Sequence, residues 1–140
     1  MRHSFAWLSV LSLLASAPLH AADTHPFGVH DMWAMKRVSD PQVSPDGKWV
    51  LFTLRTIDLE ANKGRTDLWV VGSDGAGLRQ LTSNPAADTG GRWSSDGKWI
   101  YFTSTRSGSS QVWKLAFDGG EPLQVTKLAL DASNVVVSPD

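Results

Sequence analysis

The chain contains no cysteine, so disulfide bonds, thiolate nucleophiles and thiolate metal ligands are all excluded. It also lacks an excess of one charge, because 13 lysines and arginines nearly balance 14 aspartates and glutamates, giving a net charge of −1. No run of basic residues occurs, which argues against nucleic acid as a partner. The stability of this protein must therefore come from the packing of its side chains.

Histidine is scarce, and its placement excludes most acid–base chemistry. All four histidines precede residue 31, and no G-x-S-x-G nucleophile motif occurs. The remainder of the chain therefore offers no Ser-His-Asp set. We predict no catalytic residue in this chain.

The other polar motifs predict neither a cofactor nor a metal ion. His25 and His30, with Asp23 and Asp31, do not have the spacing of a common metal motif, so we predict no metal ligand. The glycine-rich stretch 72–77 is not a Walker-type phosphate loop and is typical of a turn. We likewise predict no cofactor-binding residue.

Long hydrophobic runs are absent, and the longest uncharged apolar stretch lies near the N-terminus. Residues 5–17 are small and apolar and follow a short basic start, but they are too few to span a bilayer, which needs about 20 apolar residues. Ala21 and Ala22 provide a small-residue cleavage site. We therefore predict a signal peptide over residues 1–22, with an uncleaved anchor or a buried helix as the alternative. The mature chain is expected to be periplasmic or secreted, without a membrane partner.

What the sequence does contain is a repeat. Residues 43–53 (VSPDGKWVLFT) return as 93–103 (WSSDGKWIYFT), and 137–140 (VSPD) begin a third copy. Three further landmarks recur 44 residues later: Trp69, Asp74-Gly75 and Leu81-Thr82 correspond to Trp113, Asp118-Gly119 and Val125-Thr126. The aspartates of the first two copies are instead 50 residues apart, so the first unit carries six extra residues. We place them in the polar stretch 56–66, since surface loops absorb insertions at little cost.

Each unit is expected to form four short strands, and the Asp-Gly pairs at 46–47 and 96–97 are typical of hairpin turns. Turn geometry therefore explains Asp46, Asp96 and Asp140 better than acid–base chemistry does. The expected strands are 42–44, 48–54, 67–71 and 78–82 in the first unit, and 92–94, 98–105, 111–115 and 122–126 in the second.

The central strands are apolar on both alternating faces, as in Trp49-Val50-Leu51-Phe52, so each sheet must be covered on both sides. Four-stranded sheets that repeat at this length and stack face to face are typical of a β-propeller. We predict an all-β partial propeller with two four-stranded antiparallel blades, over about 42–82 and 91–126, and the first strand of a third at about 134–140. The tryptophans are expected to form the core between blades.

A lead-in over residues 23–41 separates the signal from the propeller. Asp31 is placed to cap a helix over Met32–Val38, and Pro41 should then hold the chain extended. Arg92 and Arg106 lie near strand ends, where either could face a central channel. A solvated loop arginine is the simpler interpretation of both.

The stretch Arg37–Val50 (RVSDPQVSPDGKWV) resembles the start of the propeller in serine peptidases of the prolyl oligopeptidase family, in particular the acylaminoacyl-peptidase and dipeptidyl-peptidase-like bacterial branch. The later pieces DLWVV, RQLT and FTS are similar both to this family and to TolB-type propeller repeats. The resemblance covers about residues 28–140. It implies an N-terminal propeller that caps a separate α/β-hydrolase domain, which would hold the Ser-Asp-His triad and act on short peptides.

Two hypotheses follow. In the first, the chain is the beginning of an exported serine peptidase whose partner is a peptide substrate. In the second, it belongs to a non-enzymatic TolB-like periplasmic propeller that binds a protein or ligand. The short lead-in favours the first, because TolB-type proteins resemble a separate α/β domain followed by a propeller. In either case, two blades should expose apolar faces through which the chain could associate with itself.

Overall fold

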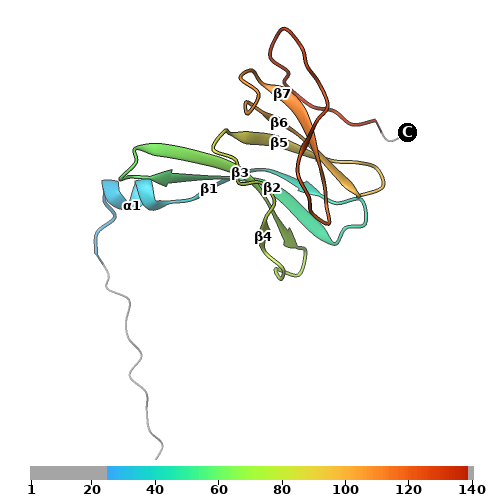
Figure 1. Ribbon diagram of the computed structural model, residues 1–140. Coiled ribbons are helices and arrows are strands. Elements are labelled where there is room, and N and C mark those ends of the chain that lie inside the picture. The colour runs from blue at the N-terminus through green and yellow to red at the C-terminus, as the bar shows by residue number, and fades with distance from the viewer. Residues whose placement is uncertain (1–24, 139–140) are drawn as a thin grey trace, which may run out of the picture.

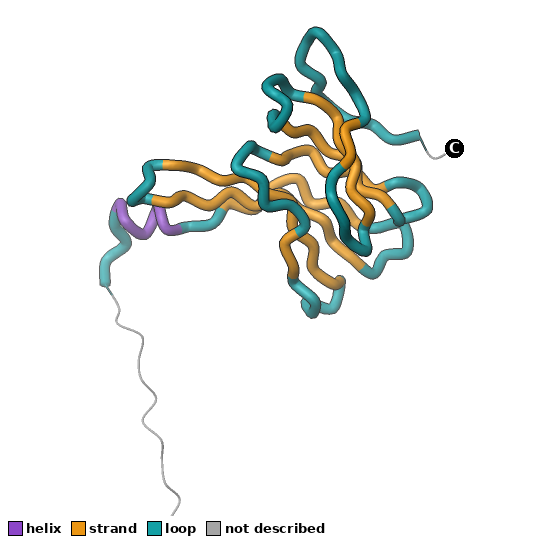
Figure 2. The backbone as a smooth tube through the Cα atoms, viewed as in Figure 1, coloured by secondary structure: helices purple, strands orange, loops and turns teal. Residues whose placement is uncertain are grey.

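The structure, a computed structural model, describes residues 25–138 and consists of one short helix followed by two four-stranded antiparallel sheets (Figure 1). The strand orders are β1-β2-β3-β4 and β5-β6-β7-β8, so each sheet is a meander in chain order (Figure 2). The elements are α1 Val29–Ala34, β1 Arg37–Val43, β2 Trp49–Asp58, β3 Lys63–Gly72, β4 Arg79–Gln80, β5 Asp88–Trp93, β6 Trp99–Ser104, β7 Gln111–Ala116 and β8 Leu123–Gln124. The predicted all-β class and the two antiparallel blades are confirmed.

The hairpin turns form where the Asp-Gly pairs predict them. Gly47 and Gly97 have φ angles of 71° and 69°, in the left-handed region that glycine adopts without a steric cost. The six extra residues of the first unit also lie where they were expected. They lengthen the hairpin of β2 and β3, whose strands have 10 residues each, whereas β6 and β7 have 6 each.

The lead-in differs from the prediction. The helix covers Val29–Ala34 instead of Met32–Val38, and its N-cap is Gly28, whose N–H donates to Asp31 Oδ2 at 2.7 Å. The helix ends early because the following residues pair with β2, with Arg37 opposite Arg55 and Val38 opposite Leu54. The first strand therefore begins at Arg37, five residues before the expected start. Long-range pairing has overridden a local helical signal here.

The expected start of a third blade forms no strand within the described residues 134–138, and Asp140 lies outside the described range, as do residues 1–22 of the predicted signal peptide. In the first two units the opening strand pairs with the second strand of its own unit. At the repeat's spacing, the second strand of a third unit would lie beyond residue 138, so this segment has no ladder partner among the described residues.

The core lies between the two sheets. Its fully buried members are Leu51 and Leu68 from the first sheet and Ile100, Phe102 and Leu115 from the second. β5 can approach the first sheet closely because Gly91 has no side chain: a Cβ there would lie 2.8 Å from Leu51 Cδ2.

The expectation that the tryptophans form this core is only partly right. Trp93 and Trp113 pack against it but remain half-buried, and Trp49, Trp69 and Trp99 are half-buried as well. Side chains alternate along a strand, so Trp69 lies on the face of the first sheet opposite Leu68, and Trp99 on the face of the second sheet opposite Ile100. These two indoles therefore lie on the outer flanks of the pair of sheets.

An aromatic cluster joins the sheets beside the core. The ring of Phe117 meets Trp49 of the first sheet edge-on at 5.4 Å and Trp93 of the second at 5.0 Å between centroids. Arg79 of β4 places its guanidinium 4.6 Å from the Phe117 ring centroid and donates from Nη2 to the Phe117 carbonyl at 2.7 Å. Phe117, which follows β7 directly, thus contacts Trp49 and Arg79 of the first unit and Trp93 of the second.

A buried ion pair lies at the far end of the same interface. Asp88, at the start of β5, is fully buried, and its Oδ2 accepts from Arg106 Nη2 at 2.7 Å. The Arg106 guanidinium also covers the rings of Phe102 and Trp113, 5.5 Å and 4.9 Å from their centroids. Such a pair contributes orientation more than net stability, because removing its charges from water offsets much of their attraction.

Asp67 is the least well compensated polar group of the first sheet. It is 5% exposed, and its Oδ1 has no hydrogen-bond partner in the described part of the chain. Burial raises the pKa of Asp67 above its ordinary value of 3.8, and the charge of Asp88 adds to the rise, while Arg65 and Arg106 oppose it. Arg65 Nε lies 3.9 Å from Asp67 Oδ2, which is too far for a hydrogen bond.

We predict that Phe117→Ala lowers the free energy of unfolding by about 2 kcal/mol, because it removes two ring contacts and a cation–π contact from the sheet interface. Urea denaturation followed by far-UV circular dichroism measures the change. Phe27→Ala is the matched control, because the Phe27 ring is 70% exposed and its loss should leave stability unchanged. Equal effects of the two substitutions would contradict the role assigned to Phe117.

We predict that Asp67→Asn raises the free energy of unfolding above that of the parent protein at neutral pH, and that this gain is smaller in acid. A carboxyl whose pKa is raised by folding stabilises the folded state fully below its ordinary value of 3.8, and this contribution disappears as the pH rises through the folded-state value. The advantage of Asp67→Asn over the parent should therefore shrink as the pH falls through that window. Urea titrations at several pH values test this, with Asp118→Asn on an exposed turn as control. If the difference in free energy of unfolding between Asp67→Asn and the parent did not change with pH, the charge of Asp67 would not be its cause.

Candidate functional site

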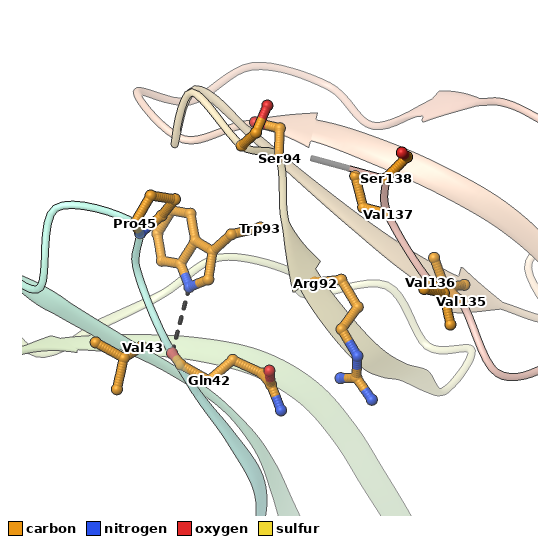
Figure 3. Close-up of a pocket in the computed structure, with 11 residues that line it drawn as sticks. Gln42, Val43, Pro45, Arg92, Trp93, Ser94, Val135, Val136, Val137 and Ser138 are labelled. Carbon is orange, nitrogen blue, oxygen red and sulfur yellow. Dashed lines mark hydrogen bonds between the residues drawn. The ribbon is translucent and has the colours of Figure 1, made fainter. Parts of the chain in front are cut away.

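The opening strands of the two sheets meet the third-unit segment at a cleft of about 360 Å³ (Figure 3). Three stretches of chain line it: 42–45 at the end of β1, 92–95 at the end of β5, and 135–138. These stretches occupy the same place in three successive repeats, so the cleft is a product of the repeat itself.

Arg92 is the charged residue of this cleft, and it is paired. Its Nη1 donates to Asp40 Oδ2 at 2.7 Å and to the Gly91 carbonyl at 2.7 Å, while Gln42 Nε2 donates to the other oxygen of Asp40 at 3.2 Å. The sequence-based interpretation of Arg92 as a solvated loop arginine is therefore wrong. It links the opening strands of the two sheets.

Asp40 reaches Arg92 because the backbone of β1 is irregular at this point. Asp40 has a φ angle of 52°, and the pairing of β1 with β2 shifts register between Ser39 and Gln42. The expectation that Pro41 simply holds the chain extended fails at this residue. Aspartate tolerates the left-handed region better than most residues do, and the bulge turns its carboxylate toward the second sheet.

The rest of the cleft combines an indole with aliphatic side chains. Trp93 Nε1 donates to the Gln42 carbonyl at 3.3 Å, so the indole is directed toward β1 (Figure 3). Val43 and Val135–Val137 supply the apolar lining. Such a surface can bind an apolar side chain or an extended backbone.

The cleft holds no activated nucleophile that the structure describes. Ser94 Oγ donates to Asp96 Oδ1 at 2.6 Å and accepts from the Trp99 N–H at 2.9 Å, so turn formation uses this hydroxyl. The histidines within residues 25–138 lie at 25 and 30, in the lead-in and outside the cleft lining. Acyl transfer by a serine requires a general base such as histidine beside the hydroxyl, and no histidine lines this cleft.

The turn aspartates have the same geometry in both units. Ser44 Oγ donates to Asp46 Oδ1 at 2.6 Å, and the Lys48 N–H donates to the same oxygen at 3.1 Å. The hydrogen bond from the serine, followed by that from the lysine backbone, lowers the pKa of Asp46, and the equivalent groups lower that of Asp96. Both carboxylates are therefore acceptors that hold a hairpin, as the sequence indicates.

The remaining candidates are placed as follows. Arg106 is 12% exposed in its pair with Asp88, so it is not a solvated loop residue, and it does not line the cleft. His25 Nε2 lies 3.4 Å from Asp31 Oδ1, and His30 contacts the Trp33 ring. No group of three His, Asp or Glu side chains suited to a metal occurs among residues 25–138, and Asp23 lies outside them. Across the described helices, none is long and apolar enough to cross a membrane.

Sequence reasoning missed Asp40, the partner of Arg92. The two residues are 52 positions apart, and neither periodicity nor composition connects them. The available signal was an aspartate directly before a proline, just ahead of the expected strand 42–44, which is a common place for a bulge or turn.

Comparisons with known proteins agree with this architecture. Over 106 residues the chain is 31% identical to dipeptidyl-peptidase 5 of Porphyromonas endodontalis, a match that covers 76% of this chain and 15% of that protein. A putative TolB from Agrobacterium tumefaciens is similar in structure, with a TM-score of 0.52, 32% identity, and coverage of 64% of this chain and 30% of that one. An acylaminoacyl peptidase from Pyrococcus horikoshii has a TM-score of 0.56 over 74% of this chain and 15% of its own; at 22% identity this likeness shows the fold alone.

The chain thus spans well under two thirds of each of these proteins. Residues 32–140 match the family model of the TolB beta propeller domain, which covers both sheets and the third-unit segment. The chain therefore belongs to the TolB β-propeller domain family.

Proposed function

We propose that this chain forms the first part of the propeller of an exported serine peptidase that hydrolyses short peptides. In this proposal the catalytic Ser, Asp and His belong to a separate α/β-hydrolase domain. The propeller narrows the access to that domain, so that short peptides enter and folded proteins do not. The chain by itself binds and positions other parts of the protein and does not hydrolyse peptides.

One observation carries this proposal. The relative named dipeptidyl-peptidase 5 matches this chain over 106 residues, yet these residues make up only 15% of that protein. The matched region in this chain forms propeller sheets, and within residues 25–138 no histidine contacts a serine hydroxyl. A division of labour, with chemistry in a different domain from the propeller, accounts for both facts.

A specific observation also favours a second candidate. The putative TolB from Agrobacterium tumefaciens is as similar in sequence as the peptidase is, at 32% identity. A TolB-like propeller that binds a protein or ligand in the periplasm would have the same two sheets. The lead-in supports the peptidase: α1 ends only three residues before the first propeller strand, without an intervening α/β domain between residues 25 and 37.

Export is part of this proposal. The uncharged apolar stretch at residues 5–17 and the small residues at 21 and 22 support a periplasmic or secreted protein with a signal peptide over residues 1–22. After cleavage we expect no membrane association. N-terminal sequencing of the mature protein from the periplasmic fraction would locate the cleavage site.

The coding DNA beyond codon 140 tests the proposed peptidase. We expect further copies of the repeat, then a G-x-S-x-G motif followed by Asp and His. The protein made from that complete reading frame should cleave fluorogenic dipeptidyl substrates, and replacing the motif serine with alanine should reduce kcat by about 10⁴-fold or more. Residues 1–140 alone should be inactive. Further repeats followed by a stop codon without this motif would support the TolB-like alternative instead.

We also infer that the chain on its own associates through its outer flanks, where Trp69 and Phe52 lie on the first sheet and Trp99 and Tyr101 on the second, all half-buried. Sedimentation velocity should give an average mass that rises with concentration. Tyr101→Lys should reduce this association, whereas Thr105→Lys, on an exposed loop, should not. A monomer at all concentrations would refute the inference.

A further inference from the structure

The end of the β2–β3 hairpin forms a second hollow, remote from the cleft of the opening strands. Figure 1 shows α1 lying against this end of the hairpin, which is the end distant from the second sheet. The hollow has a volume of about 360 Å³, and its lining comes from α1 and both strands: Trp33, Arg55, Ile57, Leu59, Asn62, Lys63 and Gly64.

This hollow exists because the first unit departs from the repeat. The second unit lacks the six extra residues, so β6 and β7 form a shorter hairpin. Residues two apart on a strand share a face, so Arg55 and Ile57 continue the face on which Leu51 contacts the second sheet. Beyond the reach of the second sheet, α1 covers this face instead. Blade formation does not require the extension, as the second unit demonstrates.

The cations of the hollow have no internal partner. Within residues 25–138, neither Arg55 nor Lys63 forms an ion pair or a side-chain hydrogen bond, and the lining includes no carboxylate. Asp58, opposite Lys63 in the ladder, accepts from the Ala61 N–H at 3.0 Å instead. The Arg55 guanidinium lies close against the backbone of Gly64, where an added Cβ would be 3.2 Å from Nη2. Two positively charged residues therefore line one hollow, and within residues 25–138 neither side chain is paired with a carboxylate.

The same hollow opens onto exposed apolar side chains. Trp33 is 41% exposed and Leu59 is 45% exposed, and Phe27, Met32 and Met35 of the lead-in are exposed as well. A free inorganic anion would satisfy the two cations but would leave this apolar surface in water. A polypeptide that carries carboxylates between apolar residues would satisfy both.

We propose that this hollow is a docking site for an extended acidic peptide segment of a partner protein. A carboxylate of the segment binds Arg55, whose forked guanidinium suits a carboxylate, and Lys63 adds a second positive charge. Apolar neighbours of that carboxylate pack on Trp33 and Leu59. This role goes beyond the proposed peptidase function and does not depend on it.

A fluorescein-labelled octapeptide that alternates leucine and glutamate is the probe, and fluorescence anisotropy with the complete chain measures its binding. We expect Arg55→Gln to weaken binding about tenfold or more, as expected for the loss of a charge-assisted hydrogen bond. Trp33→Ala should weaken it as well, and added salt should reduce the affinity. Lys127→Gln is the matched control, because it removes the same charge from an exposed position on the second unit.

Several results would overturn the proposal. A peptide with glutamine in place of glutamate that binds equally well would exclude recognition of the carboxylate. Equal losses in Arg55→Gln and Lys127→Gln would show only non-specific attraction to net charge. Free glutarate that binds as tightly as the octapeptide would reassign the hollow to small carboxylates. Unchanged circular dichroism spectra of the variants ensure that a loss of binding is not a loss of fold.

Discussion

The structure depends on one constraint: each four-stranded sheet is apolar on both faces and must be covered on both. Leu51 and Leu68 of the first sheet are fully buried only because the second sheet lies over them, and Ile100 and Phe102 are buried for the reciprocal reason. At roughly 25 cal/mol per Å² of apolar surface removed from water, the contact between blades is a major stabilising interaction in such an array. The contact between sheets, and not the sheet alone, is therefore the stable unit.

The turns serve this contact by fixing where each strand begins. In both units a serine accepts from the tryptophan N–H five residues later and donates to the aspartate two residues later. This network starts β2 and β6 at equivalent points, so Trp49 reaches the position where Phe117 meets it. A hydrogen-bonded turn at the sheet's end thus determines an aromatic contact between sheets. The cleft of the opening strands follows from the same register.

Much of this fold could be predicted from the sequence because local chemistry determines it. The Asp-Gly turns, the repeat and the lengthened first hairpin each follow from residues adjacent in the chain. The features that could not be predicted depend on partners distant in the chain. Arg37 belongs to a strand because β2 pairs with it, and Arg92 is held by Asp40, 52 residues away. Arg106 could not be recognised as buried without knowing that Asp88 faces it. The burial of the tryptophans was overestimated, because the apolar character of a side chain does not reveal which face of the sheet a neighbouring sheet covers.

Departures from the repeat separate what is needed for the scaffold from what is specific to this chain. Gln111 stands 44 residues after Asp67, at the same point of the next unit. Its amide is fully buried and binds Thr126 and the backbone of residues 128–130, so it fastens the connection that follows the second blade. Asp67 makes none of the equivalent bonds in the described structure and keeps one oxygen unpaired. The same unit also carries the lengthened hairpin and the uncompensated Arg55 and Lys63. Because a repeating scaffold requires none of these features, the lengthened β2–β3 hairpin of the first blade is where this chain differs from a generic propeller unit and where selection for a specific partner would act.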